Sequence, residues 1–173
     1  MQIKTETRFN PKHQRLYQNI LKLTQPIQES YPNYQKWYEN TFLEGLKKGE
    51  RIILMAEEKG TLLACALLKK TRLEKKLCTL FVYPDFRGQG IGSLLLKRTI
   101  AVLGQKPLAS VSEKNMKGVF SLFNRFGFHL SSKKKGKYSP QNTEYYFNDE
   151  RAEIIQKGLI PVLIQRAKKL QKS

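Results

Sequence analysis

The stretch that decides the fold is YPDFRGQGIGSLLLKRTI, residues 83–100. It follows a strand-like apolar run, Leu77 to Val82, and leads into a segment whose apolar residues recur at helical spacing. Between the two stand three glycines at alternate positions, Gly88, Gly90 and Gly92. Glycine lets backbone N–H groups converge without a Cβ in the way, and a helix N-terminus attracts anions. The stretch therefore predicts a strand, a pyrophosphate-binding turn and a helix.

The spacing of the glycines excludes two common phosphate-binding motifs. A P-loop ends in Gly-Lys-Ser/Thr, whereas here Gly92 is followed by Ser93 and Leu94. A dinucleotide-binding G-x-G-x-x-G that starts at Gly88 needs glycine at position 93, where the chain has serine. Neither a nucleotide triphosphatase nor a Rossmann enzyme is predicted.

The hexapeptide RGQGIG, residues 87–92, fits the pattern R/Q-x-x-G-x-G/A. The lead-in V-x-P-x-x-R-G, Val82 to Gly88, and the later segment FNRFGF, residues 123–128, accompany it. On these motifs the chain resembles the GNAT superfamily of acyl-CoA N-acyltransferases over about residues 50 to 148. The resemblance implies an N-acetyltransferase that uses acetyl-CoA as cosubstrate and needs no metal.

The order of the predicted elements agrees with this resemblance. A first strand (3–9), two helices (10–23 and 32–49) and three consecutive strands (51–57, 61–69 and 77–82) precede the glycine turn. A helix (88–103), a short strand (107–112), a helix (115–126) and two closing strands (from 128, and 143–147) follow it. Three strands in an antiparallel meander argue against a parallel βαβ sheet. The predicted fold class is α+β, an α/β/α sandwich with a mixed, mostly antiparallel sheet, in which the family's fourth and fifth strands splay apart around the pantetheine arm.

The chain of 173 residues suits one catalytic domain, predicted as residues 1–148, followed by a C-terminal extension over residues 149–173. The extension reads as a basic amphipathic helix with Pro161 inside it. Its expected role is packing on the domain or on a homodimer partner, with membrane or nucleic-acid binding as the alternative.

The resemblance assigns the coenzyme contacts residue by residue. Backbone N–H groups of the turn are expected to bind the pyrophosphate, Phe81 and Val82 to pair with the pantetheine amides, Ser93 to add a hydroxyl to phosphate, and Asn115 to contact the coenzyme arm. The expected pyrophosphate ligands are Arg87, Gly88, Gln89, Gly90, Ile91 and Gly92.

The acid and the base are harder to assign. Family members carry the acid as a tyrosine, and Phe123 stands at that position here. We predict Tyr138 as its replacement, with Tyr145 and Tyr146 as alternatives. The family's usual base is a carboxylate on the fourth strand, which residues 77–82 lack, so Glu74 and Glu113 are the candidates, with Thr79 or a water as a relay. The first two helices shape the family's acceptor pocket, so some of Tyr31, Tyr34, Trp37 and Tyr38 are expected on the substrate side.

The charge balance is the outlying feature of the composition. There are 32 Lys and Arg against 14 Asp and Glu, a formal net charge of +18. This predicts attraction to polyanions and argues mildly against a polycationic acceptor. A protein, peptide or small-molecule amine is the expected acceptor. A toxin that acetylates aminoacyl-tRNA, or a non-catalytic coenzyme sensor that binds nucleic acid through its basic patches, are the alternatives.

The compartment is predicted from the cysteines and from the hydropathy. Cys65 and Cys78 lie in apolar runs and read as small buried residues with reduced thiols. The longest apolar run, Leu62 to Leu68, is too short to span a membrane, and the first ten residues lack the apolar region of a signal peptide. A cytoplasmic protein is expected.

Overall fold

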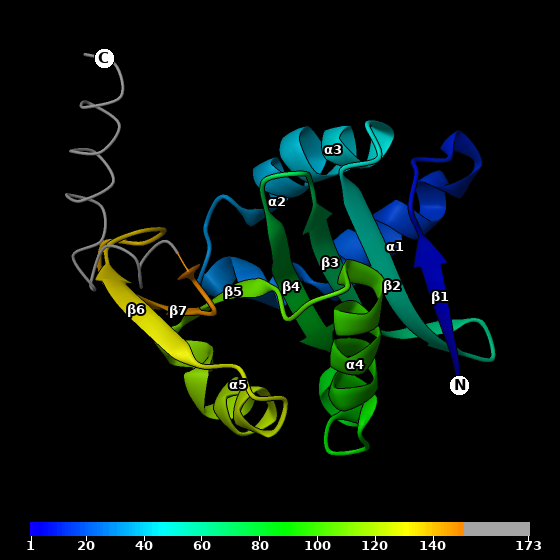
Figure 1. The fold of residues 1–173 in the computed structure, drawn as a ribbon. Helices are drawn as coiled ribbons and strands as arrows, with labels where there is room; N and C mark the ends of the chain where they lie inside the picture. Colours follow the sequence, from blue (N-terminus) through cyan, green and yellow to red (C-terminus); the bar gives the residue numbers. More distant parts are fainter. Residues whose placement is uncertain (151–173) are drawn as a thin grey trace, which may run out of the picture.

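The computed structural model describes residues 1–150, which form one mixed sheet with helices on both faces (Figure 1). The strands are β1 (Gln2–Glu6), β2 (Arg51–Glu58), β3 (Thr61–Lys70), β4 (Lys75–Val82), β5 (Leu108–Ser112), β6 (Leu130–Lys135) and β7 (Thr143–Phe147). Their order in the sheet is β1-β2-β3-β4-β5-β7-β6. All neighbours pair antiparallel except β4 and β5, which run parallel. The α+β sandwich with a mostly antiparallel sheet is confirmed.

The helices divide between the two faces. The α-helices are α1 (Gln14–Leu23), α2 (Tyr34–Trp37), α3 (Leu43–Lys47), α4 (Ile91–Leu103) and α5 (Glu113–Arg125). Short 3-10 turns span Pro11–His13, Gln25–Glu29 and Pro84–Phe86, and a π-helical segment, Tyr38–Phe42, joins α2 to α3. Helices α1 to α3 cover one face of the sheet, and α4 and α5 cover the other (Figure 1).

Most predicted boundaries hold to within three residues. Asn10 caps the first helical turn as expected, because its side chain accepts the N–H of Lys12 at 3.0 Å. Helix α4 begins at Ile91 rather than at residue 88, so the glycines precede it as a turn. Helix α5 begins at Glu113, two residues early, so the candidate base Glu113 lies in its first turn. The predicted C-terminal helix falls almost entirely on residues 151–173, outside the described part of the chain.

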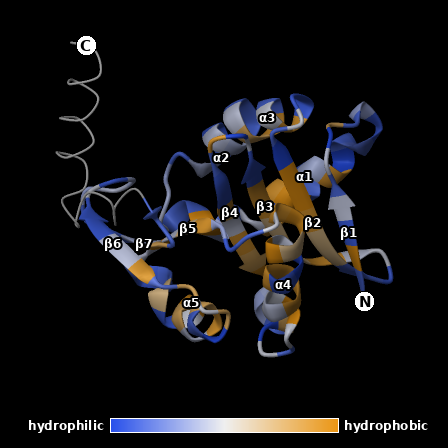
Figure 2. Ribbon diagram, viewed as in Figure 1, coloured by the Kyte–Doolittle hydropathy of each residue, from blue (hydrophilic) through white to orange (hydrophobic). Residues whose placement is uncertain are grey.

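Two apolar clusters sandwich the sheet, because alternate residues of a strand face opposite sides. Leu54, Ala66 and Phe147 belong to the cluster under α4 and α5, while Ile53 and Cys65 belong to the cluster under α1 to α3. The central strands β2 and β3 are accordingly apolar in their middle, over residues 52–56 and 62–68 (Figure 2). This double burial holds the middle of the sheet rigid.

Two irregularities of β4 shape the centre of the molecule. Leu67 pairs with Thr79 and Leu68 with Leu77, so Cys78 is an extra residue, a β-bulge. Only the pairs Lys76–Leu108 and Leu77–Ala109 join β4 to β5. Beyond Leu77 the two strands separate, which confirms the predicted splay between the fourth and fifth strands.

Candidate active site

The glycine turn is held in a conformation that needs glycine. Gly88 and Gly90 have φ angles of +76° and +82°, in the left-handed region that other residues adopt only with strain. A Cβ on either residue would meet no atom within 4 Å, so the space in front of the turn is open. Gly92 differs, since it lies inside α4, and its Cβ would make ordinary contacts of 3.6 Å and 3.7 Å with Leu122 and Val82.

The turn presents unpaired N–H groups to this open space. Within residues 1–150, no group accepts a hydrogen bond from the N–H of Gly88, Gln89 or Gly90. The first backbone bond of α4 runs from Leu94 N to Gly90 O at 3.0 Å, which leaves the N–H groups of residues 91–93 free at the positive end of the helix. Together these groups form an anion-binding cradle.

Arg87 is tied to the end of β4 rather than to the cradle. Its N–H donates to Pro84 O at 3.1 Å, so this backbone group is not free for a phosphate. Its Nε donates to Val82 O at 3.0 Å, and the guanidinium carbon lies 5.7 Å from the centre of the Phe81 ring. The side chain thereby fixes the turn against the strand.

The free edge of β4 can be identified from the ladder that it makes with β3. Tyr83 N donates to Leu63 O at 2.9 Å, and in an antiparallel pair the residues bonded to a given neighbour alternate. Thr79 and Phe81 lie two and four residues before Tyr83, so their peptide groups also point toward β3. The N–H and C=O groups of Leu80 and Val82, which lie between them, point toward the splay. The predicted pantetheine contact at Phe81 accordingly faces the wrong strand, and Leu80 offers the free groups instead.

A polar cluster lies on the other side of the splay, between the α1–α2 connection and β5 and β7. Tyr31 Oη donates to Glu144 Oε1 at 2.9 Å and accepts the N–H of Ser112 at 2.9 Å. Glu144 is only 3% exposed. Burial raises the pKa of the Glu144 carboxyl, and hydrogen bonds from Tyr31 and Ser110 and the charge of Lys76 oppose this only in part. Burial, and then the charge of Glu144, raises the pKa of Tyr31.

A second tyrosine of the same turn reaches the opposite strand. Tyr34 N donates to Tyr31 O at 2.9 Å, so the two residues are one helical turn apart. A hydrogen bond of 3.3 Å joins Tyr34 Oη to Thr79 Oγ1 on β4. Burial raises the pKa of Tyr34. One tyrosine hydroxyl thus lies against β4 and the other against β5 and β7, one on each side of the splay.

A groove of about 690 Å³ opens beside this cluster, where β4 and β5 begin. Its described lining includes Glu74, Lys76, Leu108, Lys137, Tyr138 and Tyr146. Tyr138 connects the groove to the cluster, since its ring lies edge-on to that of Tyr31 with centroids 5.3 Å apart. The groove thus reaches the cluster through the ring of Tyr138.

Comparison with known proteins identifies the family. A profile of the Acetyltransferase (GNAT) family matches residues 13–128. The chain belongs to this family. Its members are acetyl-CoA-dependent acetyltransferases, so the class of enzyme and the cosubstrate expected from the sequence are confirmed.

Solved structures with the same fold are numerous but distant in sequence. One from Desulfovibrio desulfuricans, described as an acetyltransferase of the GNAT family, has a TM-score of 0.65 at 16% identity over 84% of this chain and 97% of its own. The ribosomal-protein-S18-alanine N-acetyltransferase of Escherichia coli has a TM-score of 0.63 at 16% identity, covering 84% of this chain and 92% of its own. An aminoglycoside 6′-N-acetyltransferase complexed with coenzyme A has a TM-score of 0.62 at 11% identity, covering 85% and 95%. No curated protein matches the chain.

Phe123 stands where the resemblance led us to expect the family's tyrosine acid. Phe123 is 2% exposed, and its ring stacks on Phe128 with centroids 4.6 Å apart and meets Phe147 edge-on at 5.0 Å. This position is part of the core and carries no proton to donate. Tyr138, the predicted replacement, is 42% exposed above the Tyr31 ring, on the groove side of the splay.

The two glutamates predicted as bases do not lie together. Glu74 precedes β4, where that strand still pairs with β5, and forms an ion pair with Lys69 at 2.6 Å. Glu113 is exposed at the start of α5. Asn115, also exposed, donates its side-chain amide to Ser30 Oγ at 3.3 Å. Glu144 was not predicted as a site residue. It is the one carboxylate in the strand TEYYF, but its burial is visible only in the folded structure.

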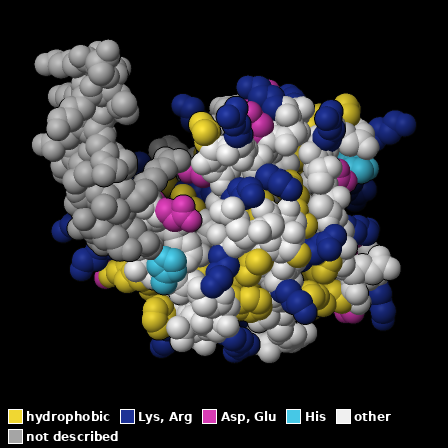
Figure 3. Space-filling model, in the orientation of Figure 1, with side chains coloured by type: hydrophobic (Ala, Val, Ile, Leu, Met, Phe, Trp, Pro, Cys, Tyr) yellow, Lys and Arg dark blue, Asp and Glu magenta, His cyan; other side chains and the backbone are white. Residues whose placement is uncertain are grey.

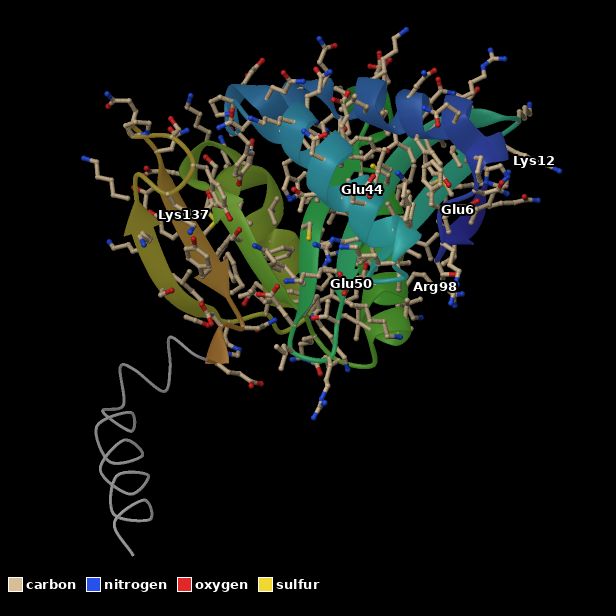
Figure 4. All side chains as sticks on the ribbon, turned by 90° about the horizontal axis from the view of Figure 1, so that it is seen from above. Glu6, Lys12, Glu44, Glu50, Arg98 and Lys137 are labelled. Carbon is tan, nitrogen blue, oxygen red and sulfur yellow. The ribbon has the colours of Figure 1, made fainter. Side chains whose placement is uncertain are left out.

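On the face drawn in Figure 3, the Lys and Arg side chains are spread out rather than gathered into one patch. Arg98 on α4 and Lys137 beside β6 lie on opposite sides of the molecule (Figure 4). Within residues 1–150, no helix is long and apolar enough to cross a membrane, and no three His, Cys, Asp or Glu residues gather as ligands for a metal.

Proposed function

We propose that this acetyltransferase transfers the acetyl group of acetyl-CoA to a primary amine by direct attack of the amine on the thioester. The observation that carries the proposal is that, within residues 1–150, no strand pairs with the outer edge of β4 at Leu80 and Val82, immediately before a turn with unpaired N–H groups; on this edge Val82 O accepts only from the side chain of Arg87. A pantetheine arm can add to that edge as a strand while its pyrophosphate occupies the turn, as expected for a cradle at a helix N-terminus.

The residues proposed for the coenzyme follow from this geometry. Gly88 to Ser93 bind the pyrophosphate through N–H groups, and Ser93 can add its hydroxyl. Leu80 and Val82 pair with the pantetheine amides, with Arg87 held at the junction by its bond to Val82. Asn115 serves the arm only if it exchanges its present bond to Ser30.

The acceptor amine reaches the thioester from the groove on the α1–α2 side. That groove carries both signs of charge, since its lining includes Lys76 and Lys137 as well as Glu74. A polycation would gain little there, so a peptide or protein amine, or a small amine of low positive charge, is the acceptor that we propose. The aminoacyl-tRNA acceptor and the coenzyme sensor remain the alternatives, and the separation of Arg98 from Lys137 supports neither.

Two measurements test the proposal. Calorimetric titration with coenzyme A is expected to show binding, and free-thiol release from acetyl-CoA is expected with at least one member of a panel of peptides with varied N-termini, propylamine, spermidine and aminoacyl-tRNA. Release with aminoacyl-tRNA alone would select the tRNA alternative. Binding of coenzyme A with no thiol release from any amine would select the sensor, and absence of binding would refute the coenzyme site.

A further inference from the structure

The cluster formed by Tyr31, Ser112 and Glu144 has no part in the coenzyme contacts proposed above. A buried carboxylate is costly unless it is paired, and Glu144 is 3% exposed. Across residues 1–150 it forms no ion pair, and its hydrogen bonds come from two neutral hydroxyls, that of Tyr31 at 2.9 Å and that of Ser110. The fold therefore keeps a poorly compensated carboxylate inside the molecule.

A second polar group in the same place is also unsatisfied. Ser112 is fully buried, and its Oγ has no hydrogen-bond partner within residues 1–150. Ser112 and Glu144 are register partners on β5 and β7, so the free hydroxyl lies beside the Tyr31–Glu144 pair. A buried hydroxyl without a partner destabilises the fold, which is tolerable where a ligand completes the bond.

The position of the cluster suits a role in proton transfer. Tyr31 and Tyr34 stand on the two sides of the splay, where β4 leaves room for the thioester beyond Leu77. The Tyr31 oxygen already accepts the Ser112 N–H and donates to Glu144, and it keeps one lone pair for a further donor. Tyr31 is half-buried next to Tyr138, while Glu144 is 3% exposed, so an acceptor ammonium that enters past Tyr138 would meet the Tyr31 hydroxyl first.

We propose that Glu144 accepts the proton of the acceptor ammonium through the Tyr31 hydroxyl, an inference that rests on the proposed acetyl transfer. The ammonium gives a proton to Tyr31 oxygen as the Tyr31 hydroxyl proton moves to Glu144, which becomes a neutral carboxylic acid. The neutral amine nitrogen then bonds to the acetyl carbon, the carbon–sulfur bond breaks, and the amine's second proton ends on the thiol of coenzyme A. Glu144 returns its proton to solvent through Tyr31, so one proton is released per amide formed.

The groups that face Glu144 are consistent with this role. Tyr31 covers it from the helical side, Lys76 acts on it from β4, Lys134 is its register partner on β6, and Tyr138 and Tyr146 lie over the same face. None of them forms an ion pair with it. Burial brings the carboxyl closer in basicity to an amine, which favours proton transfer.

The test is the pH dependence of kcat in the full chain, with propylamine and the most active panel member as acceptors. Glu144→Gln keeps the size of the side chain and can still accept from Tyr31, but it cannot take a proton. We expect kcat to fall about 10²-fold to 10³-fold at pH 7, with the KM for acetyl-CoA changed less than about twofold. The deficit should shrink toward the pKa of the amine, because the acceptor then arrives already neutral. Tyr31→Phe should behave in the same way.

Tyr17→Phe is the matched control, because it removes another tyrosine hydroxyl bond, from Asn10 N at 2.9 Å, away from the splay. It should lower stability without changing the pH profile. An E144Q deficit that is equal at every pH, or no deficit, would overturn the proton transfer while leaving the acetyltransferase intact. Absence of transfer by the wild-type chain to any acceptor would instead refute the proposed function, and this inference with it.

Discussion

Replacing Gly90 with alanine separates the conformational role of the glycine turn from its role in binding. Gly90 has φ +82° and caps α4, and an added Cβ would meet no atom within 4 Å. The penalty is therefore backbone strain without a clash, about 1–2 kcal/mol of unfolding free energy. The methyl group would occupy the space in front of the cradle and turn its N–H groups away. Loss of one charge-assisted hydrogen bond, about 1.5–3 kcal/mol, should weaken coenzyme A binding roughly 10-fold to 100-fold.

Gly104 provides the control, because it lies at the other end of the same helix with φ +73° and equally open surroundings. Gly104→Ala should lose about as much stability in urea unfolding, by the same strain. It should leave the calorimetric Kd for coenzyme A unchanged. The cradle assignment would be refuted if both variants kept the wild-type affinity, or if both lost affinity in proportion to their loss of stability.

Three further outcomes are expected. Gly92→Ala should leave the unfolding free energy in urea unchanged or raise it by up to about 1 kcal/mol, since the added Cβ fits against Leu122 and Val82 and alanine favours a helix. A decrease in unfolding free energy of more than about 1 kcal/mol would contradict these contacts. The folded state raises the pKa of Glu144, so the wild-type protein loses stability as pH rises through the ordinary carboxyl pKa. The unfolding free energy of E144Q relative to wild type should therefore increase from pH 4 to pH 7. A constant difference would show that burial does not perturb this carboxyl. Burial raises the pKa of Cys65 to about 12, so this thiol should not react with a disulfide reagent at pH 7 before unfolding, whereas the half-buried Cys78 is the thiol that can be labelled in the folded protein. Rapid labelling of Cys65 would contradict its burial.

Local sequence was sufficient for the coenzyme side of the site. Glycine permits the left-handed backbone that Gly88 and Gly90 adopt, and this permission is a property of the local chain. Strand and helix periodicity placed the elements around the turn for the same reason. The family motif lies in this local segment, which is why the donor could be predicted before the structure was known.

The register of β4 against β3 could be assigned only from the tertiary structure. Whether Phe81 or Leu80 offers its peptide groups to the splay depends on which residues of β4 bond to β3, and the bulge at Cys78 shifts that register by one residue. Alternation along β4 is visible in the sequence, but its phase relative to β3 is not. The predicted contact at Phe81 was misplaced for this reason.

The acceptor side was decided almost entirely by the fold. Tyr31 and Glu144 are 113 residues apart in the chain, and only the order β5-β7-β6 brings β7 beneath the α1–α2 connection. Proximity in sequence favoured Glu74 and Glu113, which the structure places in a surface ion pair and on an exposed first turn. The sequence by itself determined the anion-binding turn, because backbone conformation is a local property. The buried carboxylate depends on long-range strand pairing and desolvation, which arise only when the sheet is assembled.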